Sequence, residues 1–173
     1  DEVAAMTVVE TAPAGSHPAA TAYAGGAARP TGFANLLGTV DHTGLGRLWI
    51  VASLLFLLAA GAAGALVGVE RAVEVDEVSI LDDALPELLN LHATAGIFLL
   101  LVPAAIGIAV AVVPLQVGAR TVAFPRAVAA SFWGWLLSGG VVLAGYAVDG
   151  GPGGGDRDGV LLWTVGLGGV VVS

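Results

Sequence analysis

The stretch LWIVASLLFLLAAGAAGALVGV, residues 48–69, contains 22 residues and no charged side chain. As an α-helix it would extend for about 33 Å, which is enough to cross the hydrocarbon core of a bilayer. Further apolar stretches follow at residues 88–113, 127–148 and 159–173, and the last of them has only 15 residues. Because a span needs about 20 residues, the sequence predicts an all-α integral membrane bundle with three full transmembrane helices and the start of a fourth.

The composition also indicates a membrane protein. Hydrophobic residues make up 57% of the chain and charged residues 12%, and the mean hydropathy is +0.90. Cysteine is absent, which excludes disulfides and thiolate ligands, and all six basic residues are arginine. The net charge of −8 argues against a nucleic-acid partner, because such a partner requires a basic surface.

The first part of the chain differs from the rest. Residues 1–40 are rich in alanine, glycine, proline and threonine and show no sustained periodicity, so we expect a flexible N-terminal tail. The transmembrane region is then expected at residues 41–173.

The arginines predict an orientation in the membrane. Four of the six flank loops on one side of the predicted bundle, namely Arg29, Arg47, Arg120 and Arg126. Positively charged loops stay in the cytoplasm. We therefore expect a cytoplasmic N-terminus and an acidic 70–87 loop outside, in a multi-pass protein of a bacterial plasma membrane.

One imidazole lies inside the second apolar stretch, in NLHATAGIFLLLVP (residues 90–103). An ionisable group within a span is costly, so His92 is a candidate functional residue. The alternative is that His92 lies near the helix end and only bonds a neighbouring carbonyl. Positions 92, 95, 96, 99 and 103 share one helical face. Small Ala95 and Gly96 on that face would let a flat macrocycle approach the backbone, although small residues also serve helix packing. Pro103 is expected to kink the helix.

The other histidines are too distant to complete a metal site. His42 precedes the first apolar stretch and His17 lies in the tail, and we expect neither to reach His92. A zinc or copper centre formed by this chain alone is therefore not expected, because it needs several protein ligands. A haem iron needs only one or two, since its macrocycle supplies four nitrogens. Haem is the better candidate cofactor for His92.

Four motifs occur in a characteristic order. DHTGLGRLWI (residues 41–50) precedes the first apolar stretch, VERAVEV (69–75) follows it, and His92 opens the second. VPLQVGARTVAFPRAVAASFW (113–133) leads into the third. This order resembles subunit I of the haem-copper oxidases, of the cytochrome c oxidase type. The resemblance covers about residues 40–173, and the proline–arginine motif is its most specific part.

The resemblance implies roles for two residues. His92 matches the axial ligand of the low-spin haem, and Arg71 matches the arginine that donates a hydrogen bond to the formyl group of haem A. For Arg71 the alternative is a loop charge paired with Glu70 or Glu74. The tryptophans are interpreted as interfacial anchors rather than electron carriers: Trp133, Trp135 and Trp163.

Some positions depart from the family pattern. Thr121 stands where the family has an aspartate at the mouth of a proton-uptake channel, and Thr43 replaces a lysine. Three apolar residues stand where the channel has asparagines: Val110, Val128 and Ala129. These residues cannot carry that proton route, because a hydrated proton needs polar groups around it.

The resemblance implies an oxidoreductase that works as part of a complex. A low-spin haem would pass electrons to a haem–copper centre that reduces oxygen to water. Copper and the second haem are held by later helices in this family. The implied partners are other oxidase subunits, the bilayer, and cytochrome c or a cytochrome-containing complex as electron donor. The alternatives are a non-catalytic accessory subunit derived from subunit I, and a small transporter with His92 as proton relay.

Overall fold

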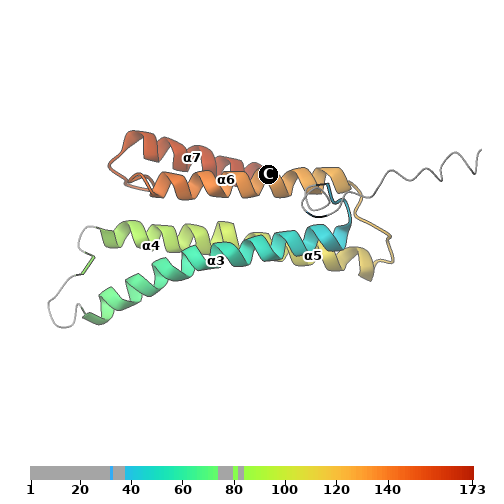
Figure 1. The fold of residues 1–173 in the computed structure, drawn as a ribbon, viewed down its shortest axis with the longest axis horizontal. Coiled ribbons are helices and arrows are strands. Elements are labelled where there is room, and N and C mark those ends of the chain that lie inside the picture. The colour runs from blue at the N-terminus through green and yellow to red at the C-terminus, as the bar shows by residue number, and fades with distance from the viewer. Residues whose placement is uncertain (1–31, 33–37, 74–79, 82–83) are drawn as a thin grey trace, which may run out of the picture. The chain divides into compact units, whose positions relative to one another are not determined.

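The computed structural model describes residues 32, 38–73, 80–81 and 84–173 (Figure 1). The chain divides into two units, Asp1–Gly38 and Thr39–Ser173. The predicted flexible tail falls almost entirely outside the described residues. The helices belong to the second unit: α3 (His42–Val73), α4 (Leu85–Thr94), η3 (Ala95–Leu101, a π-helix), α5 (Val102–Gln116), α6 (Pro125–Tyr146) and α7 (Arg157–Val172).

Three helices are long and apolar enough to cross a membrane. They are His42–Val73, the continuous helix Leu85–Gln116 formed by α4, η3 and α5, and Pro125–Tyr146. The shorter α7 has 16 residues. No strand occurs in the described parts of the chain. The predicted all-α membrane bundle, with three spans and a shorter fourth helix, is confirmed.

Side-chain caps begin two of the helices. The Oδ2 atom of Asp41 accepts hydrogen bonds from the Thr43 hydroxyl and from the Gly44 N–H, the latter at 2.8 Å. The Thr43 hydrogen bond is the main cause that holds the pKa of Asp41 below its ordinary value, so the carboxylate is ionised at neutral pH and stabilises the start of α3. Asp156 caps α7 in the same way, with 2.7 Å between its Oδ2 and the Gly159 nitrogen.

Small residues bring α3 against the helix formed by α4, η3 and α5, which runs in the opposite direction (Figure 1). A Cβ atom added to Gly46 would lie 2.7 Å from the Gly107 carbonyl oxygen and from the Ala111 Cβ. Further along the pair, Ala60 and Ala95 are buried together. Backbones approach closely here because such helices associate by van der Waals packing rather than by expelling water.

Helices α6 and α7 also pack through glycine. A Cβ atom added to Gly145 would lie 2.7 Å from the Trp163 backbone nitrogen, and one added to Gly166 would lie 2.7 Å from the Val142 nitrogen. The turn between the two helices contains Gly151 with a φ of 96°, a conformation that side chains disfavour. The glycine-rich sequence at this turn is therefore required for the tight return of the chain.

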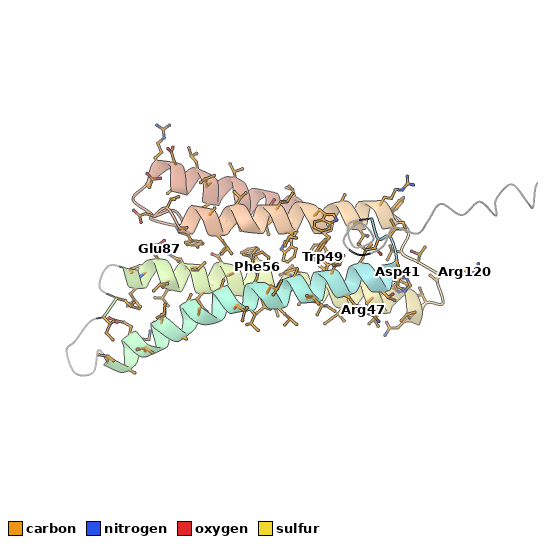
Figure 2. All side chains as sticks on the ribbon, in the orientation of Figure 1. Asp41, Arg47, Trp49, Phe56, Glu87 and Arg120 are labelled. Atoms are coloured by element: carbon orange, nitrogen blue, oxygen red, sulfur yellow. The ribbon has the colours of Figure 1, made fainter. Side chains whose placement is uncertain are left out.

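Aromatic rings join α3 to α6. The ring centroids of Trp49 and Trp135 are 4.9 Å apart, and Trp135 lies 5.3 Å from Phe56 (Figure 2 labels Trp49 and Phe56). Phe132 packs edge-on against Trp49 at 5.5 Å. Trp135 is only 2% exposed, so its interpretation as an interfacial anchor is wrong: it belongs to the core between the helices.

The second span remains one helix through Pro103, where a kink was predicted. Residues 95–101, immediately before it, form a π-helix, and the Val102 N–H donates to the Ile97 carbonyl, five residues back. A proline has no N–H to donate and its ring displaces the preceding turn. The wider π turn accommodates this strain without ending the helix.

Candidate functional site

His92 lies in the last turn of α4, next to the middle of α3. Its Nδ1 atom is 2.8 Å from the Ala60 carbonyl oxygen. A carbonyl oxygen only accepts, so Nδ1 carries the proton and donates it to Ala60. Nε2 then keeps its lone pair, and no hydrogen bond to Nε2 is found among the described residues. The α3 backbone therefore fixes both the ring and its tautomer.

Gly64 makes this approach possible. A Cβ atom added there would lie 2.7 Å from both Nδ1 and Cε1 of His92. Real Cβ atoms do not approach that closely, so any side chain at residue 64 would displace the imidazole. The sequence reasoning missed Ala60 and Gly64. The available signal was the small-residue run AAGAAGA at residues 59–65, which an antiparallel pairing places opposite residue 92.

The predicted small face beside His92 is divided. Ala95 and Leu99 are both 0% exposed and pack with Ala60. By contrast, a Cβ atom added to Gly96 would meet nothing within 4 Å. At Ala95 the alternative of close helix packing therefore holds, because the residue is covered by α3. Gly96 alone of this pair has open space beside it.

Arg71 lies in the last turn of α3, seven residues after Gly64. Seven residues are two turns, or about 10 Å, so Arg71 and Gly64 share a helical face. Arg71 is exposed, and within the described ranges no ion pair to it is found. Its neighbour Glu70 is only 3% exposed and accepts the N–H groups of residues 80 and 81 at 2.9 and 3.0 Å. Glu74, the other suggested partner, lies outside the described residues.

Two polar contacts hold α4 on either side of His92. The Thr94 hydroxyl is 3.0 Å from the Tyr146 hydroxyl of α6. The Asn90 side-chain nitrogen donates to the Pro152 carbonyl oxygen, at 3.3 Å, in the turn before α7. These bonds connect α4 to its other neighbours and fix its rotation about its own axis.

The opposite end of the second span is apolar. Val110 and Val128 line a cavity of about 380 Å³ together with Trp49, Pro103 and Trp135. Most of its lining is aliphatic or aromatic, and such a cavity has too few polar partners to hold a chain of waters. Ala129 is half-buried on α6, and Thr121 is exposed between α5 and α6.

The other histidines are far from His92. His42 begins α3 and is 7% exposed. Its Nδ1 lies 3.7 Å from Asp41 Oδ1, and no hydrogen bond to either ring nitrogen is found among the described residues. It is 22 residues from Gly64, or about 33 Å along the helix. His17 lies outside the described residues. In the described part of the chain, no three histidine or carboxylate side chains gather as metal ligands.

These features define a multi-pass membrane protein in which one imidazole is oriented by a neighbouring helix and keeps a free ligand atom. The family model described as "Cytochrome C and Quinol oxidase polypeptide I" matches residues 44–173. The chain therefore belongs to this family, subunit I of the haem-copper oxidases. A comparison with curated protein sequences gives no match.

Membership of the family has direct consequences. The chain is a subunit of an oxidase, its partners are other oxidase subunits, and the protein resides in a membrane. Members of the family generally bind haem and copper. The sequence resemblance to an oxidase subunit I is confirmed.

Proposed function

We propose that this chain holds the low-spin haem of a terminal respiratory oxidase, with His92 Nε2 as an axial ligand of the iron. The observation that carries the proposal is the 2.8 Å contact between His92 Nδ1 and the Ala60 carbonyl. Ligating histidines typically donate their second ring N–H to a carbonyl or carboxylate, which fixes the tautomer and makes the ligand more basic. When bound, the haem supplies one-electron redox chemistry.

Two further residues support haem binding in this proposal. Gly96 follows His92 by one helical turn, and the open space beside it leaves room for a flat ring against the helix. Arg71 is the candidate donor to the formyl group of haem A, because its exposed guanidinium lies on the α3 face that carries Gly64. A guanidinium stays charged at all working pH values, so this interaction would persist.

The remaining steps of oxygen reduction belong to other parts of the enzyme. Electrons would arrive from cytochrome c or a cytochrome-containing complex. The copper and the second haem would be held by the helices that follow these in other members of the family. This chain contributes the orientation of one cofactor and the electrostatics around it. Water would be the product at the haem–copper centre.

The proposed orientation places the N-terminus in the cytoplasm of a bacterial cell. Figure 2 shows Arg47 and Arg120 at the same end of the bundle, and Arg126 follows in the first turn of α6. Arg71 and the acidic residue Glu87 lie at the other end. This asymmetry favours a cytoplasmic side at the arginine-rich end.

One observation favours a second candidate, a non-catalytic accessory subunit. The cavity lined by Val110 and Val128 is apolar where the family pattern has polar residues. A subunit that does not take up protons would tolerate that change. Such a subunit, however, would not require an oriented imidazole with a free Nε2.

The test is His92→Ala in the purified oxidase complex. We expect loss of the low-spin haem α band in the reduced-minus-oxidised spectrum, because the iron loses its ligand on this chain. Glu87→Gln, five residues before His92 on the same helix, should keep the band. Gly96→Leu should lower haem content, since the leucine fills the space beside the helix. An unchanged α band in His92→Ala would rule the proposal out and favour the accessory subunit.

A further inference from the structure

We infer that Trp135 on α6 is a positioning residue for His92, because its indole N–H stabilises the π-helix that sets the direction of the imidazole. The inference rests on the proposed role of His92 as a haem ligand. It assigns to the aromatic core a task beyond packing.

Pro103 deprives the Phe98 carbonyl of its backbone donor in the π register. The Val102 N–H is given to the Ile97 carbonyl. The Phe98 carbonyl would take the next donor in the π register, from residue 103. That residue is Pro103, which has no N–H. An unpaired carbonyl inside an apolar membrane bundle is costly, because the hydrocarbon core of a bilayer supplies no hydrogen-bond donor.

Trp135 supplies the missing donor. Its Nε1 is 3.1 Å from the Phe98 carbonyl oxygen. The ring is 2% exposed and is held by contacts with Trp49, Phe56 and Phe132. Several rings therefore fix the position of one N–H, which satisfies the Phe98 carbonyl.

The register of this segment controls where His92 points. Each residue of an α-helix turns the chain by about 100°. If η3 rearranged to α-helical hydrogen bonding, α4 would rotate relative to α5, and the imidazole would move away from Ala60 and Gly64. Holding the π register therefore holds the imidazole against α3.

Trp49 provides a matched control inside the same cluster. It is also 2% exposed and lies 4.9 Å from Trp135, centroid to centroid. Its buried Nε1, however, has no hydrogen-bond partner in the described part of the chain. Phenylalanine at either position keeps an aromatic ring and removes the indole N–H, so only Trp135→Phe removes a hydrogen bond.

The experiment compares both variants in the purified oxidase complex, with His92→Ala beside them. We expect Trp135→Phe to shift the low-spin haem α band and midpoint potential, and to raise amide hydrogen exchange over residues 95–102 about tenfold. Trp49→Phe should leave all three readouts close to the parent protein. Equal behaviour of the two variants would overturn the inference, as would faster exchange with an unchanged band and potential.

A second variant keeps the test decisive if Trp135→Phe assembles poorly. Pro103→Ala gives residue 103 an N–H, which can donate to the Phe98 carbonyl in the π register. In the α register that carbonyl accepts from the Val102 N–H instead. In that background, Trp135→Phe should have a much smaller effect on exchange and on the α band. Equal effects in the two backgrounds would overturn the inference. A retained band in His92→Ala would instead disprove the proposed function, so the two failures are distinguishable.

Discussion

The two ends of the second span differ in how they treat polar groups. Around His92, polar side chains remain and have partners: Asn90 reaches Pro152, Thr94 reaches Tyr146, and the imidazole reaches Ala60. Around Val110 the same helix faces an apolar cavity. One continuous helix therefore keeps the polar contacts that orient an imidazole at one end and lacks polar groups that could hold water at the other. Different residues of the same helix determine these two properties.

Among variants that test this difference between the two ends, Gly64→Ala is expected to have the largest effect. The added methyl group would lie 2.7 Å from two atoms of the imidazole, so His92 would lose its bond to Ala60 or α3 would move away. We expect low-spin haem content in the purified complex to fall by about tenfold or more, as for loss of a residue that orients a metal ligand.

The control for this variant is Gly68→Ala, one turn further along α3. A Cβ atom at that residue meets nothing within 4 Å, so haem content should stay at the parent level. Equal losses of haem in the two variants would mean that α3 tolerates alanine at neither glycine. The contact between residue 64 and the imidazole would then not explain the effect.

A smaller effect is expected from Arg71→Met, which sharpens the assignment at the His92 end. If the guanidinium donates to an electron-withdrawing formyl group, its loss should move the haem α band to shorter wavelength and change the midpoint potential, with haem content retained. Arg157→Met removes an exposed arginine from the start of α7 and should leave the spectrum unchanged. A parent-like spectrum for Arg71→Met would leave the residue as a loop charge.

The smallest effect is expected at the other end, from Thr121→Val. Thr121 is exposed, and the helices beside it present Val110 and Val128 to an apolar cavity. The variant should therefore leave oxygen consumption and proton release within about twofold of the parent, since a dry cavity conducts no protons. A large fall in either rate, with both haems intact, would show that a proton path survives at this end.

The sequence was sufficient for the helices but not for the contacts of the site. The length of the uncharged stretch at residues 48–69 was enough to locate α3, because a stretch of that length matches a membrane span. It could not reveal that Ala60 and Gly64 face His92, since that depends on the register between two antiparallel helices. Ala95 and Leu99 do share the face of His92, as the periodicity predicts, but the sequence could not reveal that α3 covers this face. Trp135 was misplaced because position in the chain does not give a ring its depth or its partner.

The π-helix also affects how this chain should be compared with its relatives. A π turn holds one residue more than an α turn, so it corresponds to a single-residue insertion within an otherwise regular helix. A relative without Pro103 and without a tryptophan at residue 135 would have less reason to retain that residue. An alignment of such a relative with this chain should then have a one-residue gap within Ala95–Leu101. The numbering offset between the two chains would change by one residue across that gap.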